Sequence, residues 1–304
     1  MASGAISLGT GRRPLPALRL DQRGTALLLA APALLFFTFL FILPLAVMLL
    51  ISLLSGNPLW DETAHFTLQN YARLIEDSYH LEVMGQTLLL GFWVTGASLV
   101  IAYPLAYQLV RVRRAWLRTA MLVAILSPMM TGLVIRTYAW MTILADRGVI
   151  NEGLAALGLI SEPLPLMYNM LGIAVAMVHI FVPFMMLTLV GVLGRIDPAL
   201  VQAARNLGAS GPRAFFEVTL PLSLPGIVAG SLLVFALTIS SYVTPTLMGG
   251  FAFQTLPMLI YQQISASFNP GMGAAIGFVL LVVSLLIILG YGRALARFTR
   301  GGAL

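Results

Sequence analysis

The chain has 304 residues, of which 59% are hydrophobic and only 9% are charged, and its mean hydropathy is +0.95. These values exclude a soluble globular domain and indicate an integral membrane protein. All 17 basic residues are arginine, so a phosphate-binding P-loop, which needs a lysine, is excluded. The absence of cysteine excludes disulfides, thiolate metal sites and cysteine nucleophiles. The net charge of +6 does not indicate nucleic-acid binding, because membrane topology accounts for the position of the arginines.

The apolar runs predict an all-α protein with six membrane spans, since one spanning helix needs about 20 apolar residues. Residues 1–24 are expected to form a disordered cytoplasmic tail. The first transmembrane helix, 25–54, is much longer than the apolar part of a signal peptide, which has roughly 7 to 15 residues. The other five spans form a core over 82–293, and 294–304 form a cytoplasmic C-terminal tail. The six expected spans cover about 25–54, 81–110, 119–144, 170–193, 221–248 and 274–290.

The connections between the spans differ in character. Residues 145–169 predict a short surface helix followed by a proline-broken extended piece. The uncharged segment 249–273 is only moderately apolar, so we expect it to return as an interfacial or re-entrant helix. The most polar connection is 195–225, between spans four and five.

Charges sort between the two sides that six spans define. One side, with both termini, has fourteen arginines against three acids, and the other has Arg73 and Arg147 against eight acids. The positive-inside rule therefore predicts that both termini and the 195–225 connection are cytoplasmic. Adding or removing one span would destroy this sorting.

Residues 195–225 predict a helix-turn-helix. Asp197 can cap its first helix while Pro198 occupies the first turn, where a missing N–H has no cost. Gly208 can end that helix. Small residues lie on one side of it, which favours a fit into a groove of another protein.

The same stretch contains a spaced motif. Gln202-Ala203-Ala204 is followed at fixed intervals by Gly208, by Val218 and by Leu220-Pro221. This pattern resembles the EAA signature of permease subunits in type I ATP-binding-cassette (ABC) importers. Gln202 replaces the leading acid of the family, which removes a salt bridge expected there, and Val218 replaces an isoleucine. The alternative interpretation is an ordinary amphipathic loop.

The resemblance extends over most of the chain. FTLQNYARLIED at 66–77, RTYAW at 136–140, the segment 148–169 and LMGG at 247–250 are similar to the first permease of spermidine/putrescine uptake systems. The resemblance implies a subunit that imports a polyamine or a related amine or opine. Related permeases that carry amino-acid-like compounds, phosphonates, sulfate or ferric iron are the alternatives.

The resemblance also implies a set of partners and a location. These are a second homologous permease, two copies of a cytoplasmic ABC ATPase, a periplasmic or surface solute-binding protein and the lipid of a bacterial inner membrane. ATP and Mg would bind the ATPase, so this chain would hold no cofactor and would not be an enzyme. The helix at 198–206 would be the coupling helix that docks on the ATPase. The implied coupling residues are Asp197, Gln202, Ala203, Ala204, Arg205, Gly208, Ala209, Ser210, Leu220 and Pro221.

Polar residues inside the expected spans are candidates for the translocation path. Arg136 is either part of an external gate, paired with an acid such as Asp146 or Glu152, or an anchor at a helix end. The hydroxyls after residue 239 either line a cavity or bond to their own backbone. The path candidates are Arg136, Tyr138, Trp140, Ser240, Ser241, Tyr242 and Thr244.

The sequence gives little support for a proton relay, for catalysis or for metal binding. His179 is expected to make a hydrogen bond between helices, because no carboxylate for a proton relay lies in the interior of an expected span. The pair Gly226 and Gly230 predicts close helix packing. No catalytic or metal-binding constellation is present. A secondary transporter driven by an ion gradient is the main rival class, but such proteins usually carry intramembrane acids and inverted repeats.

Overall fold

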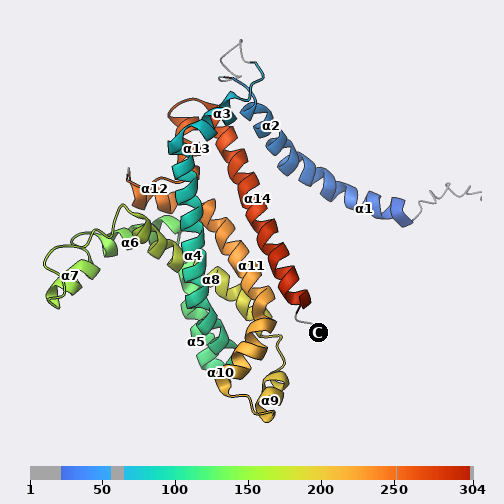
Figure 1. The fold of residues 1–304 in the computed structure, drawn as a ribbon, viewed down its shortest axis with the longest axis vertical. Helices are drawn as coiled ribbons and strands as arrows, with labels where there is room; N and C mark the ends of the chain where they lie inside the picture. Colours follow the sequence, from blue (N-terminus) through green and yellow to red (C-terminus); the bar gives the residue numbers. More distant parts are fainter. Residues whose placement is uncertain (1–21, 56–64, 251, 302–304) are drawn as a thin grey trace, which may run out of the picture. The chain divides into compact units, whose positions relative to one another are not determined.

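The structure is a computed structural model that describes residues 22–55, 65–250 and 252–301 (Figure 1). Residues 1–21 of the expected tail and residues 302–304 lie outside the described part. The described residues form helices and no β-strand, with a single bridge between Leu54 and Phe66. The chain divides into two compact units, residues 1–48 and residues 49–304. The protein is an all-α membrane protein.

The first unit carries the first span. It comprises α1 (Gln22–Phe37), the π-helical turn η1 (Thr38–Ile42) and the start of α2 (Leu43–Ser52). The wide turn directly precedes Pro44, and the N–H of Leu43 bonds to the carbonyl of Thr38. A proline ring clashes with the carbonyl four residues before it, so a π turn at this point lets the helix continue.

Three long helices form the core of the second unit. They are α4 (Ser78–Arg111), α8 (Met170–Leu193) and α11 (Leu220–Ile239), and each packs on the other two. A Cβ atom on Gly226 would lie 2.9 Å from Val192 Cβ, and one on Gly230 would lie 2.5 Å from Thr188 Oγ1. The expected close packing is therefore confirmed, since α11 can approach α8 only where it has no side chain.

The third expected span is broken, which corrects the single helix predicted over 119–144. It consists of α5 (Ala115–Leu126), the 3₁₀ turn η2 (Ser127–Met130) and α6 (Leu133–Leu144), followed by α7 (Val149–Ala156). The two halves meet at an angle of 99°. Pro128 tightens the turn, and Thr131 and Gly132 then have extended ψ angles, which ends one helix before the next begins.

The fifth span also differs from the prediction. Helix runs from α10 (Gly211–Ala214) through the π turn η3 (Phe215–Thr219) into α11, and it ends at Ile239 instead of Met248. A separate helix, α12 (Val243–Gly249), follows. Pro245 has no N–H to donate to the carbonyl of Ser241, so the helical ladder is interrupted there.

The remaining helices complete the second unit. α3 (Gln69–Glu76) precedes α4, α9 (Pro198–Asn206) lies between α8 and α10, and α13 (Leu256–Ser265) packs against α14 (Pro270–Gly301). Ten residues of α13 span about 15 Å, too little to cross a membrane, as the interfacial or re-entrant prediction requires. α14 starts before and ends after the expected span of 274–290, so the predicted tail 294–304 is helical as far as Gly301.

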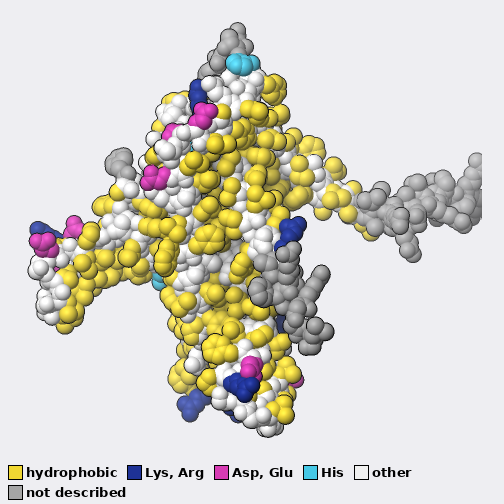
Figure 2. All heavy atoms as spheres, viewed as in Figure 1, with side chains coloured by type: hydrophobic (Ala, Val, Ile, Leu, Met, Phe, Trp, Pro, Cys, Tyr) yellow, Lys and Arg dark blue, Asp and Glu magenta, His cyan; other side chains and the backbone are white. Residues whose placement is uncertain are grey.

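Five helices of the described part are long and apolar enough to cross a membrane, and the bent pair α5–α6 raises the number to as many as six. In the second unit, hydrophobic side chains cover the middle of the face seen in Figure 2. Basic side chains gather at the end that carries α9, whereas acidic ones gather at the opposite end and on α7. The charge sorting predicted from the sequence thus appears at two separate ends of one bundle.

Candidate functional site

Helix α9 is closed at both ends by its own sequence. At the start, Asp197 Oδ1 accepts a hydrogen bond from the N–H of Ala199 at 2.8 Å, and Pro198 is the first helical residue. At the end, Gly208 adopts a φ of +93°, its N–H donates to the Arg205 carbonyl, and the Ala209 N–H donates to the Ala204 carbonyl. This pair of bonds is the Schellman ending. The cap and the stop predicted from sequence are both present.

The two faces of α9 differ. One face of α9 lines a cavity toward the bundle. It carries four residues at the spacing of one helical stripe, namely Pro198, Val201, Gln202 and Arg205. The opposite face presents Ala203, with Leu200 49% exposed and Leu207 90% exposed just beyond the helix. We call this the outer face of α9. Apolar exposed side chains on a capped, rigid helix are suited to docking on another protein.

The segment after α9 joins it to a span without a flexible loop. Ser210 precedes α10 without a side-chain cap, and Arg213 Nε donates to Glu217 Oε1 at 2.8 Å. Leu220 and Pro221 lie in the first turn of α11, which directly follows the π turn η3. Like Pro44, Pro221 follows a π turn that moves a carbonyl away from the proline ring.

Arg136 lies on α6 without the acidic partner expected for it. Its side chain is half-buried, and its Nε and Nη1 atoms are buried without a hydrogen-bond partner in the described part of the chain. The ion pairs found among those residues include neither Asp146 nor Glu152 with Arg136, so both the gate and the anchor alternatives stay open. The segment of α7 near α6 is fixed instead by Asn151, whose amide donates to the carbonyls of Ala145 and Leu164, both at 3.1 Å.

The hydroxyl cluster after α11 forms local bonds and a bond between helices. Ser240 Oγ donates to the carbonyl of Ala236 at 2.8 Å, which is the backbone-bonded alternative. Thr244 is fully buried and its Oγ1 lies 3.0 Å from Thr137 Oγ1, joining α12 to α6. Sequence reasoning missed Thr137, although a threonine on an apolar helix is a signal for such a bond between helices.

The aromatic candidates of the path lie apart from one another. Tyr138 on α6 is 54% exposed, whereas the Tyr242 ring packs against Tyr261 of α13 in a tilted arrangement, with centroids 4.9 Å apart. Ser241 follows the end of α11. The path candidates therefore do not converge on one cavity within this chain, and their role stays a prediction.

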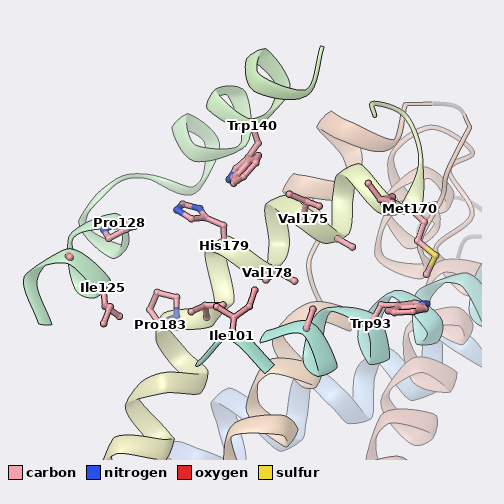
Figure 3. Close-up of a pocket in the computed structure, with 15 residues that line it drawn as sticks. Trp93, Ile101, Ile125, Pro128, Trp140, Met170, Val175, Val178, His179 and Pro183 are labelled. Atoms are coloured by element: carbon pink, nitrogen blue, oxygen red, sulfur yellow. The ribbon is translucent and has the colours of Figure 1, made fainter. Parts of the chain in front are cut away.

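Trp140 lines the largest cavity described here, which has a volume of about 750 Å³ and which we call the apolar cavity (Figure 3). It lies among α4, α5, α6 and α8, and His179 is its one ionisable lining residue. The His179 ring points to Trp140, with centroids 5.5 Å apart in an edge arrangement. Within the described residues this ring contact replaces the hydrogen bond between helices that we expected for His179.

Two segments that carry the family resemblance meet in space. The N–H of Tyr168, at the end of 148–169, donates to the carbonyl of Met248 at 3.1 Å. Gly250 has a φ of +56°, and a Cβ atom there would lie 2.9 Å from the Tyr168 ring. The positive φ and the nearby Tyr168 ring therefore explain why a glycine occupies position 250, the last position of the LMGG motif.

A bundle of apolar helices with a capped polar helix at one end defines a multi-pass transport protein of the permease class. The chain belongs to the family described as binding-protein-dependent transport system inner membrane component, whose pattern matches residues 22–300. It is therefore an ABC importer permease subunit, and such subunits are not themselves enzymes.

Two relatives of the chain are permease proteins of spermidine/putrescine transport systems. The chain is 34% identical over 229 residues to the spermidine/putrescine transport system permease protein PotB of Salmonella typhimurium (strain SL1344), covering 75% of this chain and 79% of the relative. It is 29% identical over 256 residues to PotB of Haemophilus influenzae (strain ATCC 51907 / DSM 11121 / KW20 / Rd), covering 84% and 89%. A bacterial alginate ABC transporter, solved in complex with an alginate pentasaccharide-bound periplasmic protein, shares the fold with a TM-score of 0.69 at 18% identity, covering 90% of this chain and 95% of that chain.

Proposed function

We propose that this chain imports a polyamine such as spermidine or putrescine, driven by ATP hydrolysis on a partner subunit. The observation that carries the substrate class is the 34% identity to a spermidine/putrescine permease over three quarters of the chain. The observation that supports the partner is the outer face of α9, where exposed apolar side chains are held by a cap and a Schellman ending.

Movement of α9 reaches the spans through short, bonded connections. On one side, the N–H groups of Arg195 and Ile196 donate to the carbonyls of Val192 and Leu193, which continues the end of α8 toward α9. On the other side, α10 and η3 continue into α11. Because α8 and α11 touch at Gly230, a displacement of α9 would move both spans together. Closure of the ATPases would thereby switch the permease between inward and outward access.

The complete assembly would contain a second homologous permease, two ABC ATPase subunits that bind ATP and Mg, and a solute-binding protein outside. The chain would lie in a bacterial inner membrane with both termini cytoplasmic. The described structure supports this orientation through the arginine-rich end at α9, because the positive-inside rule places that end in the cytoplasm. The acidic opposite end would then face the solute-binding protein.

Other solutes of the same class remain the alternative. Amino-acid-like compounds, opines, phosphonates and ferric iron would use the same α9 and differ in the binding protein. An ion-gradient transporter is a more distant alternative. The acids found in the described spans, Glu82 and Glu217, lie near helix ends, where they are poorly placed for ion coupling inside the membrane.

The test has two readouts on the same cells. The tagged chain is expressed with its genomic neighbours and purified, and uptake of radiolabelled spermidine is measured with and without excess competitor solutes. We expect an ATP-binding subunit to copurify, and unlabelled putrescine to compete. Failure of any nucleotide-binding subunit to copurify would overturn the importer proposal, whereas copurification with uptake of a different solute would overturn only the polyamine assignment.

A further inference from the structure

A second cavity lies under the inner face of α9. Its volume is about 490 Å³, and it is bounded by the ends of α4 and α8, the link between α4 and α5, α9 and η3. Arg111, Arg113 and Arg205 all line it, and none of its described lining residues is acidic. We call it the basic cavity. Gln202 on its wall supplies a neutral amide, so the lining has three arginines and no carboxylate.

The acids at this end of the bundle are engaged elsewhere. Asp197 accepts the capping bond from Ala199, and Glu217 pairs with Arg213. Arg111 lies over the ring of Tyr107, with 3.9 Å from its Cζ atom to the ring centroid. Among the described residues, neither Arg113 nor Arg205 has an ion pair. The lining therefore leaves net positive charge that an anion can neutralise.

A buried hydroxyl on the wall is also without a partner. Thr219 is 3% exposed and lines the basic cavity, and its Oγ1 makes no hydrogen bond within the described residues. Other buried threonines, such as Thr87 and Thr238, donate to the carbonyl four residues earlier. Thr219 is the last residue of the π turn, where the carbonyl of Phe215 accepts instead from the N–H of Leu220. Its hydroxyl is left as a donor for a bound group.

The wall around these groups is rigid. Phe215 packs edge-on against Tyr107, with centroids 5.4 Å apart, and so links η3 to α4. One turn away, Tyr103 and Ser223 share a hydrogen bond of 2.8 Å between α4 and α11. A pocket whose walls are held by such contacts is organised before a ligand arrives, which lowers the entropy cost of binding.

The cavity lies at the level where the spans end. The apolar helices α4 and α8 finish at Arg111 and Leu193, and both residues line it. The second residue of the neighbouring α5 is Trp116, 67% exposed, a residue type enriched at the membrane–water interface. Lipid phosphates occupy this level of a membrane.

We propose that the basic cavity binds a phosphate group, held by Arg111, Arg113 and Arg205 with the hydroxyl of Thr219 as an added donor. Guanidinium groups bind phosphate in bidentate, charge-assisted fashion. The phosphate comes either from the headgroup of an anionic lipid or from a free anion. In either case it joins the α4–α5 connection to α9, so its occupancy would set how freely the coupling helix moves. The proposal does not depend on which solute is carried.

The test is a thermal-unfolding titration of the full chain purified in neutral detergent. Three probes are compared, namely phosphatidylglycerol, the zwitterionic phosphatidylcholine and inorganic phosphate. A ligand that binds the folded chain raises the unfolding midpoint in a saturable manner, which gives its apparent affinity. The double variant Arg111→Gln/Arg113→Gln should weaken that affinity by about tenfold or more, since charge-assisted bonds are lost. The matched control is Arg114→Gln/Arg118→Gln, which removes two charges from the same region but none from the cavity lining.

The outcomes separate the two sources and the proposal itself. A response to phosphatidylglycerol but not to phosphatidylcholine assigns a lipid, whereas a response to inorganic phosphate with equal behaviour of both lipids assigns a free anion. Equal weakening in the cavity variant and the control, or no response to either phosphate source, overturns the proposal. Thr219→Val provides a second arm should the double variant fail to fold. We expect it to keep or raise the ligand-free midpoint while weakening the response, and an unchanged response would contradict the proposal.

Discussion

The two cavities share the same pair of helices but have opposite linings. The apolar cavity lies along the middle of α4 and the first half of α8, and its wall is aliphatic and aromatic apart from His179. The basic cavity lies at the ends of both helices, and its lining includes three arginines and a hydroxyl that has no partner among the described residues. The surroundings of α4 and α8 are thus apolar at the apolar cavity and charged at the helix ends. Function that needs charge is confined to the helix ends, where water or headgroups can solvate it.

The largest effect is expected from a change on α9 outside both cavities. Ala204→Trp places a bulky ring beside the Schellman ending of α9, so the helix can no longer fit a complementary groove. We expect uptake to fall by about a hundredfold or more, equivalent to roughly 2.7 kcal/mol, with normal insertion in the membrane. Ala120→Trp on the exposed side of α5 is the control and should leave uptake intact. Normal uptake in the Ala204 variant would refute the coupling role of α9.

The close packing of α11 against α8 is tested by replacing a glycine with alanine at two positions, one at this contact and one away from it. Gly230→Ala would place a methyl group 2.5 Å from Thr188 Oγ1 and should destabilise the chain by about 1 to 3 kcal/mol. Gly96→Ala on α4 meets no neighbouring atom within 4 Å and should stabilise it by roughly 0.5 to 1 kcal/mol. Denaturant unfolding of the full chain measures both. A neutral or stabilising effect of Gly230→Ala would show that α8 and α11 are not in close contact there.

Arg136 tests whether charge near the apolar cavity serves transport. Arg136→Met removes the guanidinium but keeps the length of the side chain. The Nε and Nη1 atoms of Arg136 have no hydrogen-bond partner among the described residues, so the substitution breaks no bond made by these two atoms. If the residue belongs to a gate, uptake should fall by about tenfold, or about 1.4 kcal/mol, at an unchanged level of membrane-inserted chain. A loss of inserted chain without a specific uptake defect would identify an anchor at a helix end.

The smallest effect is expected at His179. Its ring contact with Trp140 is an edge-on aromatic pair, so His179→Leu should lower the free energy of unfolding by about 0.5 to 1.5 kcal/mol. Uptake should change by less than about twofold, because the imidazole has no hydrogen bond in the described structure to relay a proton. A pH-dependent loss of uptake in this variant would reveal chemistry in the apolar cavity that its lining does not suggest.

Local signals in the sequence were strong enough to predict some elements closely. The fourth span was predicted at 170–193 and α8 covers Met170–Leu193. The capped start of α9 followed from Asp197 and Pro198, and its end followed from Gly208. In each case the information lies in residues adjacent in the chain: an apolar run of spanning length, a side chain that caps, and a glycine that accepts positive φ.

Other features depend on contacts that composition does not encode. The third span reads as one apolar run although Pro128 and Gly132 break it, because hydropathy measures how apolar a run is and not whether it is straight. The acids near Arg136 in sequence suggest Asp146 or Glu152 as its partner, but the ion pairs of the described residues include neither. A threonine on an apolar helix signals a bond between helices, but Thr137 and Thr244 are more than one hundred residues apart, and only the folded chain shows that they pair.

The central claim is that the outer face of α9 docks on an ATP-hydrolysing subunit, and the natural absence of cysteine makes a direct measurement possible. Single cysteines are introduced by Ala203→Cys on the outer face and by Val201→Cys on the face toward the basic cavity. The complex is purified and treated with a short thiol-to-amine cross-linker. We predict that the Ala203 variant forms an adduct with the ATPase subunit and the Val201 variant does not. Equal adducts from both faces, or none from Ala203 in a complex that contains the ATPase, would contradict the claim.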